Sequence, residues 1–439
     1  MATTGFTWGV ATASYQIEGA THRDGRLPCI WDTYAATPGK VVNGENGDRA
    51  CEHYDRWQSD VDLIASLGVD AYRLSIAWPR VMDEQGRPNR AGIDFYKRLL
   101  DRLEAKGLKR FVTLYHWDLP QHLEDRGGWV NRDTAYRFAD YADLMSRELS
   151  GHVTAWATLN EPWCSAFLGY ANGRHAPGRT NLRFATQAMH HLLLGHGLAL
   201  PALEANDPGA LRGLVANIGR GAPERDTPAD REAARLFEVQ HNEWVLGPLL
   251  RGAYPADLFR LWPGTEPLVL PGDMETIHRP LDFLGINYYF VSTLRSDGAH
   301  GFTELPPPAG AELTQMGWHV HPQGLQELLV RFKASYPNLP PIYITENGMA
   351  SDDRVVDGEV DDAQRIAYLN RHFAAVSGAM EAGVDVRGYF IWSLMDNYEW
   401  AFGYTPRFGI VHVDYATQQR TLKQSAKAFT AFLKNRSAG

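Results

Sequence analysis

Two glutamates, Glu161 and Glu346, each directly follow a short apolar segment of the chain. Two carboxyl groups that face each other across a pocket can cleave a glycosidic bond with retention of configuration, because one protonates the leaving oxygen while the other attacks the anomeric carbon. The first group must then be protonated and the second ionised, so their surroundings must push the two pKa values apart. The spacing alone leaves another interpretation open, in which the two glutamates are unrelated acids at strand ends.

A charged residue inside another apolar segment fits the same chemistry. Arg73 shares a strand face with Ala71 and Ser75, whose small side chains leave room for a long cation. An arginine in the middle of a strand is rarely buried without an acidic partner. We therefore expect Arg73, together with the hydroxyl of Tyr289, to contact the ionised glutamate.

These residues must be positioned by the strands and helices that carry them. Eight short segments rich in β-branched and aromatic residues are predicted as buried strands: 6–11, 69–76, 109–116, 153–160, 211–218, 282–289, 341–346 and 388–393. Eight longer segments with helical spacing separate and follow them: 54–67, 94–106, 134–149, 183–203, 229–250, 325–335, 363–382 and 424–433.

Strict alternation of strands and helices indicates an α/β fold, and we expect a single (β/α)8 TIM barrel with extended βα loops that spans residues 1–439 as one domain. The Pro-rich stretch 305–308 is interpreted as a loop insertion. A doubly wound open sheet is the main alternative, although no G-x-G-x-x-G follows the first strand. In a barrel the active site lies at the carboxyl ends of the strands, and every expected strand except the first and the fifth ends in a polar or aromatic cluster.

Composition excludes several classes of protein. The net charge is −9, with 43 Lys and Arg against 52 Asp and Glu, so we expect no nucleic-acid partner and no attachment to anionic lipid. No run of about 18 uncharged apolar residues is present, so no segment is predicted to span a membrane. Three cysteines and the lack of a visible signal peptide indicate a cytoplasmic protein. Self-association into a homo-oligomer stays open.

Three features that could suggest other chemistry are explained more simply. The histidines of the run at 190–196 share no helical face at a metal-binding spacing, and the acidic stretch 352–362 lacks the spacing of an EF-hand loop. We expect the first to be packed helix histidines and the second to be solvated. Cys164, close to Glu161, is expected to be a small buried thiol. No metal and no cofactor are predicted.

Seven motifs resemble those of glycoside hydrolase family 1, the β-glucosidases. In order along the chain they are SYQIEG at 14–19, YHWDLP at 115–120, TLNEP at 158–162, GINYY at 285–289, GW at 317–318, ITENG at 344–348 and WSLMDNYEW at 392–400. The resemblance covers nearly the whole chain. It implies a (β/α)8 barrel and a retaining β-glycosidase that acts on oligosaccharides or β-glucosides, with a role in cellulose degradation.

The resemblance also implies a role for individual residues. Glu161 would be the acid/base, Glu346 the nucleophile, and Asn160 the partner of the sugar 2-hydroxyl, while Arg73 and Tyr289 would hold the nucleophile. The residues that would bind the sugar or the leaving group are Gln16, His116, Trp117, His175, Asn287, Trp318, Trp392, Glu399, Trp400 and Phe408. In the family the bond corresponding to Trp392–Ser393 tends to be cis.

Family members differ mainly in whether the sugar carries a 6-phosphate. Glu399 would repel a phosphate and suits neutral hydroxyls, so we expect an unphosphorylated glucosyl unit, with galactosyl and fucosyl units as further candidates. Arg407 is the one nearby residue that favours the alternative, a 6-phospho-β-glucosidase. A transglycosidase would use the same catalytic residues, and a non-hydrolytic sugar binder is disfavoured because both glutamates are present.

Overall fold

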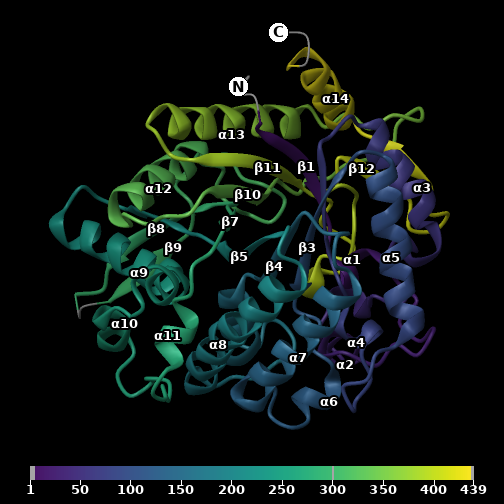
Figure 1. The fold of residues 1–439 in the computed structure, drawn as a ribbon. Helices are drawn as coiled ribbons and strands as arrows, with labels where there is room; N and C mark the ends of the chain where they lie inside the picture. Colours follow the sequence, from purple (N-terminus) through teal and green to yellow (C-terminus); the bar gives the residue numbers. More distant parts are fainter. Residues whose placement is uncertain (1–4, 299–300, 437–439) are drawn as a thin grey trace.

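A computed structural model of the chain describes residues 5–298 and 301–436. Eight parallel strands close into a barrel in the order β1, β11, β10, β7, β5, β4, β3, β2 (Figure 1). Their bounds are β1 Thr7–Ala11, β2 Ala71–Ser75, β3 Lys109–Tyr115, β4 Ala155–Asn160, β5 Leu211–Asn217, β7 Phe283–Asn287, β10 Ile342–Asn347 and β11 Val386–Trp392. All eight expected strands are in this barrel, and its closure rules out the doubly wound sheet.

Both faces of the barrel strands are buried, which explains their nearly continuous apolar sequences. Rings from opposite sides of the barrel meet inside it: the centroid of Phe111 on β3 lies 4.8 Å from that of Phe390 on β11 and 5.2 Å from that of Tyr343 on β10. The interior is therefore a packed core below the site and not a channel.

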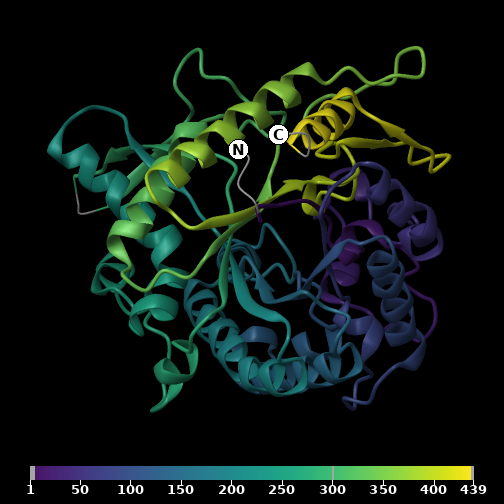
Figure 2. The same ribbon diagram turned by 45° about the horizontal axis from the view of Figure 1, so that its top comes forward.

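Long helices surround the barrel (Figures 1 and 2). Eight correspond to those expected: α3 His53–Ser66, α5 Arg90–Ala105, α7 Asp133–Glu148, α8 Leu182–Asn206, α9 Pro228–Arg251, α12 Pro322–Ser335, α13 Ala363–Glu381 and α14 Gln424–Arg436. Gly68 and Gly107 follow two of them with φ of 76° and 75°, a left-handed conformation that glycine adopts without strain and that ends a helix.

The connections between strands and helices carry further short elements. The helical ones are α1 Ser14–Ile17, α2 Ile30–Ala35, η1 Val42–Gly44, α4 Trp78–Val81, α6 Gln121–Glu124, η2 Gly128–Val130, η3 Cys164–Ala171, α10 Ala256–Leu261, α11 Asp273–Ile277 and η4 Trp400–Phe402. The strands β6 Arg220–Pro223, β8 Val291–Ser296 and β9 Phe302–Leu305 form a separate sheet, and β12 Val411–Val413 pairs with β13 Arg420–Leu422. Leu305 ends β9 and residues 306–308 follow it, so the expected loop insertion begins at the edge of this additional sheet. No helix in the described ranges is long and apolar enough to cross a membrane.

The acidic stretch after β10 is not wholly solvated, contrary to expectation. Asp353 and Asp362 are 5% and 1% exposed, and both pair with the buried Arg365. Lys423, just before α14, bonds Asp353 at 2.5 Å and Asp396 at 2.6 Å. Although burial opposes ionisation, the cations Arg365 and Lys423 lower the pKa of Asp353. A buried ion network therefore joins the loops after β10 and β11 to α14.

We expect Lys423→Met to lower the free energy of unfolding by about 3–5 kcal/mol, because it leaves two buried carboxylates without their shared cation. Lys427→Met is the matched control, since Lys427 pairs with Glu359 on the surface and such a pair contributes less than about 1 kcal/mol. Urea denaturation of both variants measures the difference. Equal losses would show that the buried network contributes no more than a surface pair.

Candidate active site

A cavity of about 860 Å³ lies at the carboxyl ends of the barrel strands. Twelve of the fifteen residues predicted to form the site line it: His116, Trp117, Glu161, His175, Asn287, Tyr289, Trp318, Glu346, Trp392, Glu399, Trp400 and Phe408. The other three, Gln16, Arg73 and Asn160, are buried behind this wall.

Glu346 is held by two hydrogen-bond donors. Arg73 Nη1 lies 2.6 Å from Glu346 Oε1, and the Tyr289 hydroxyl lies 2.6 Å from Oε2. Burial and the charge of Glu346 raise the pKa of Tyr289 well above its ordinary value. The hydroxyl therefore stays protonated and donates a hydrogen bond to Glu346. An ion pair and a second donor together favour the ionised carboxylate.

Glu161 lies in the opposite kind of environment. Glu161 is 5% exposed, and its Oε1 accepts a hydrogen bond from Asn287 Nδ2 at 2.7 Å. Burial, followed by the charge of Glu346, raises the pKa of Glu161 to about 8. The fold therefore favours the protonated form of Glu161, whereas it surrounds Glu346 with a cation and a hydroxyl donor.

Amide side chains connect the two glutamates. Asn160 Oδ1 accepts hydrogen bonds from Arg73 Nη2 at 2.6 Å and from Asn287 Nδ2 at 3.2 Å. Asn160 Nδ2 then donates to His116 Nε2 at 3.1 Å, which places the proton of the neutral ring on His116 Nδ1. Burial, with Arg73 nearby, lowers the pKa of His116 well below its usual range, and His116 Nδ1 has no partner among the described residues. His116 thus presents a free N–H donor.

Backbone conformation marks the same site. Trp117, Glu161 and Trp400 have φ values of 76°, 48° and 53°, in the left-handed region that bulky residues rarely adopt. Such strain persists only where surrounding structure enforces it, and it clusters at functional sites. The Trp392–Ser393 peptide bond is cis, as the resemblance implied.

Aromatic rings form the wall beside these polar groups. The centroids of Trp117 and Trp400 are 4.7 Å apart, and the His116 ring stacks on Trp392 at 5.9 Å. Glu399 faces the cavity next to them with an oxygen, Oε2, that has no partner in the described chain. Burial and the carboxyl groups of Glu346 and Glu161 raise the pKa of Glu399. Flat rings beside unpartnered polar atoms suit a ligand with C–H faces and hydroxyl groups.

Gln16 is oriented by the loop that carries Glu399. Its Nε2 donates to Asn397 Oδ1 at 3.0 Å and to the Tyr398 carbonyl at 2.8 Å. This leaves Gln16 Oε1 as a buried acceptor without a partner in the described structure. The amide is therefore fixed in one orientation with an acceptor to offer.

Comparison with known proteins decides the family. The model of glycosyl hydrolase family 1 matches residues 2–438. The chain belongs to glycosyl hydrolase family 1. It is 45% identical to the bifunctional β-D-glucosidase/β-D-fucosidase of Bifidobacterium breve, over 99% of this chain and 98% of that protein. The thermostable β-glucosidase B of Thermobispora bispora is 48% identical over 96% of this chain and 88% of its own length.

Solved structures agree with this assignment. The family 1 β-glucosidase of Thermotoga maritima superposes with a TM-score of 0.95 to 0.96 in the two structures compared, and the higher value covers 99% of this chain and 98% of that one at 42% identity. The fold and family expected from the motifs are thus confirmed, and the chain is a glycoside hydrolase.

Some residues of this family 1 site were not found from the sequence. Asn217 ends β5, the strand for which no polar cluster was expected, and it lines the cavity. Three residues after Glu161 a π-helix begins, Cys164–Ala171, a rare conformation that is frequent at functional sites. Cys164 is a buried free thiol, as expected, and faces the cavity. No periodicity in the sequence distinguishes this π-helix from an ordinary helix.

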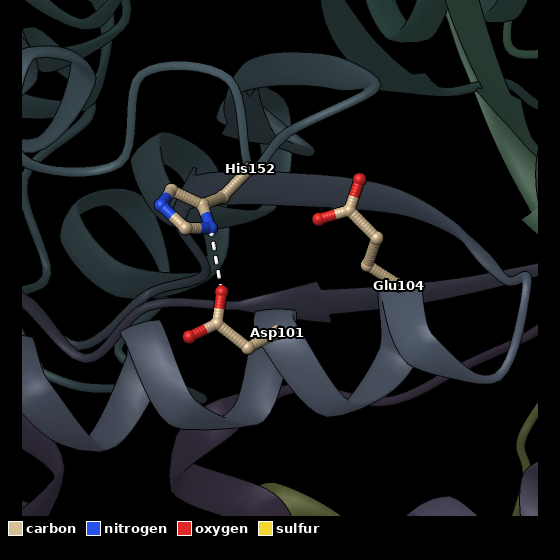
Figure 3. A group of neighbouring side chains, drawn as sticks. All are labelled: Asp101, Glu104 and His152. Carbon is tan, nitrogen blue, oxygen red and sulfur yellow. Dashed lines mark ion pairs between the residues drawn. The ribbon is translucent and has the colours of Figure 1, made fainter.

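Among the described residues, one group outside the cavity has side chains that could hold a metal ion. Asp101 and Glu104 project from α5 toward His152, which precedes β4 (Figure 3). The group lies at the amino ends of the strands, opposite the cavity. His152 Nδ1 pairs with Asp101 at 2.8 Å and Glu104 pairs with Arg110 at 3.2 Å, so surface ion pairs explain it.

Proposed function

We propose that this family 1 chain is a retaining β-glucosidase that hydrolyses oligosaccharides or β-glucosides by double displacement. The observation that carries the proposal is the pair Glu161 and Glu346, which line one cavity: Glu346 is paired with Arg73, and burial raises the pKa of Glu161 to about 8. Relatives at 45% and 48% identity bear β-glucosidase names. A cytoplasmic location and a role in cellulose degradation stay predictions.

In the first step, the Glu346 carboxylate attacks the anomeric carbon while protonated Glu161 gives its proton to the leaving oxygen. The bond from anomeric carbon to leaving oxygen breaks, and an ester between the sugar and Glu346 forms. Arg73 and Tyr289 hold Glu346 in place for the attack. Asn287, which is expected to bind a sugar hydroxyl, also donates to Asn160 Oδ1 and Glu161 Oε1 and so positions the acid/base.

In the second step, Glu161 takes a proton from water, and the hydroxyl attacks the same carbon and releases Glu346. Two inversions at one carbon return the β configuration. Asn160 Nδ2 keeps one N–H beyond its bond to His116 and is proposed to bind the sugar 2-hydroxyl. His116 Nδ1, Gln16 Oε1 and Glu399 Oε2 supply further polar atoms for hydroxyls.

The position of Arg407 favours an unphosphorylated sugar. Its Nη1 bonds Asp396 Oδ2 at 2.6 Å, its guanidinium lies over the Tyr415 ring, and it does not line the cavity. The residue that favoured a 6-phospho-β-glucosidase is thus engaged elsewhere, while Glu399 faces the cavity. Burial and two nearby carboxyl groups raise the pKa of Glu399, and a phosphate would add further negative charge there.

We expect kcat/KM for nitrophenyl β-glucoside to exceed that for its 6-phosphate by at least about 100-fold, because the phosphate would be buried beside carboxyl groups while Arg407 is bonded to Asp396, and a buried unpaired charge costs several kcal/mol. A panel of nitrophenyl glucoside, galactoside and fucoside, each also tested with 6-phosphate where a 6-hydroxyl exists, measures this preference. A phosphoglucoside that outpaces the plain glucoside would contradict the assignment. Product analysis at high sugar concentration separates hydrolysis from transfer to a second sugar.

A further inference from the structure

One loop carries three of the residues that are predicted to bind the sugar. Residues 393–410 connect β11 to β12, and we call them the β11–β12 loop. Glu399, Trp400 and Phe408 of this loop line the cavity. Because Glu399 Oε2 bonds no other described residue, no hydrogen bond orients that oxygen. The place of the carboxyl group therefore depends on where the loop holds its backbone.

The two arms of the β11–β12 loop are joined at its base by backbone hydrogen bonds. The Ser393 N–H donates to the Phe408 carbonyl at 3.1 Å, and the Ile410 N–H donates to the Ser393 carbonyl at 3.0 Å. Gly409 lies so close to the other arm that a Cβ atom on it would be 2.1 Å from the Asp396 nitrogen. The arms are thus in direct contact where Asp396 lies.

The Asp396 side chain adds further bonds to this base. The residue is fully buried, and its Oδ1 accepts hydrogen bonds from the Gly409 N–H at 3.0 Å and from Lys423 Nζ at 2.6 Å. Its Oδ2 accepts a hydrogen bond from Arg407 Nη1 at 2.6 Å. Gly409 and Arg407 belong to the returning arm, whereas Lys423 directly precedes α14. One buried carboxylate therefore joins both arms and docks the loop against the start of α14.

A short segment leads from Asp396 to Glu399. Asn397 Oδ1 accepts a hydrogen bond from Gln16 Nε2, and the Tyr398 N–H donates to the Gln16 carbonyl at 3.2 Å. The Glu399 N–H donates to the Gly403 carbonyl at 2.7 Å, a bond that stays within the tip of the loop. The position of the Glu399 backbone is therefore set by the segment that begins at Asp396.

We propose that Asp396 is a positioning residue that holds Glu399 where it meets the hydroxyl groups of the sugar. This inference rests on the proposed glucosidase function and adds a residue that does not itself line the cavity. The charge of Asp396 is needed because it lies between two cations, Arg407 and Lys423. Without the anion these cations would repel each other, and the base of the loop would loosen.

A double-mutant cycle with Glu399 tests the proposal. Asp396→Asn keeps the size of the side chain and removes the charge that binds Arg407 and Lys423. We expect it to lower kcat/KM for nitrophenyl β-glucoside by at least about 30-fold, because a misplacement of about 1 Å can cost about 100-fold. In a Glu399→Ala background the same substitution should cost less than about 3-fold, because the carboxyl group that it positions is already absent.

Asp353→Asn is the matched control. Asp353 is also buried and also bonds Lys423, but it lies in the loop after β10. This variant should lose stability as Asp396→Asn does and keep kcat/KM close to that of the wild type. Urea denaturation gives the folded fraction of each variant, and kcat/KM is expressed per folded enzyme. Arg407→Met, which removes a partly exposed partner of Asp396, is a milder second variant and should show the same dependence on Glu399.

The outcomes separate positioning from a general effect on the fold. Equal losses from Asp396→Asn with and without Glu399 would overturn the proposal, because Asp396 would then act independently of that carboxyl group. Equal losses per folded enzyme in Asp396→Asn and Asp353→Asn would also overturn it. A wild-type enzyme that cleaves no β-glucoside at all, nitrophenyl glucoside included, contradicts the proposed function itself.

Discussion

Glu346→Gly is expected to lower kcat/KM for nitrophenyl β-glucoside by about 10⁴-fold or more, because no other group can form the covalent intermediate. The substitution removes a carboxylate that two donors hold in place, and it leaves a gap beside the anomeric carbon. Azide can occupy that gap and attack from the same face. We therefore expect azide to restore turnover and to yield the α-glucosyl azide, which a single displacement produces.

The azide product separates catalysis from folding. Loss of Glu346 leaves the buried Arg73 without its anion, so the variant should also be less stable. A misfolded enzyme would not respond to azide. Glu312→Gly, at an exposed glutamate that pairs with Arg371, is the control and should keep its activity. Recovery of β-glucosyl azide, or activity near wild type without azide, would contradict the nucleophile assignment.

Glu161→Ala should reduce kcat/KM for alkyl glucosides by about 10³-fold and for dinitrophenyl glucoside by far less. An alkoxide must be protonated as it leaves, whereas dinitrophenolate is stable without a proton. Steady-state rates on the two substrates give the ratio directly. Equal losses on both would contradict the role of Glu161 as the acid.

The same variant should change the dependence of activity on pH. Burial and the charge of Glu346 raise the pKa of Glu161 to about 8, and the first step needs the protonated form. Wild-type kcat/KM should therefore fall as the pH rises through about 8. In Glu161→Ala this decline should disappear for the dinitrophenyl substrate. Glu161→Gln keeps the size of the side chain but carries no acidic proton. We expect it to lose the decline at high pH in the same way as Glu161→Ala.

Much of the site was predictable because strand ends in a barrel converge. Each barrel strand is short, buried on both faces and bounded by polar residues, so its position could be read from local composition. Once eight strands close, residues that follow β4, β7 and β10 must face a common space. The contact of Arg73 and Tyr289 with Glu346 follows from that geometry and from the need of a buried cation for an anion.

Other features depend on contacts that local sequence does not encode. The orientation of Asn287 toward Glu161 is fixed by Thr345, which donates to its Oδ1 from β10 at 2.7 Å. Lys423 lies 70 residues after Asp353 in the chain. The two residues are in contact only because the start of α14 packs against the loop after β10. The spacing of Asp362 and Arg365 by three residues was a local signal that this acidic stretch contains ion pairs.

The far part of the cavity is a further case. Its lining includes residues of α9, β8 and β9, in connections whose lengths and conformations vary independently of the barrel. These residues have no periodicity relative to the catalytic motifs, so their place in the cavity required the folded structure, whereas the catalytic pair did not.

The most direct test of the double-displacement account is mass spectrometry of the enzyme after reaction with a 2-deoxy-2-fluoro-β-glucoside that carries a good leaving group. Fluorine at the 2-position slows both the formation and the release of the covalent intermediate, and the good leaving group speeds only its formation, so the intermediate accumulates. We predict one added fluoroglucosyl unit per chain, located by peptide mapping at Glu346. An unlabelled protein that still hydrolyses glucosides, or a label on Glu161 or Glu399, would contradict the account.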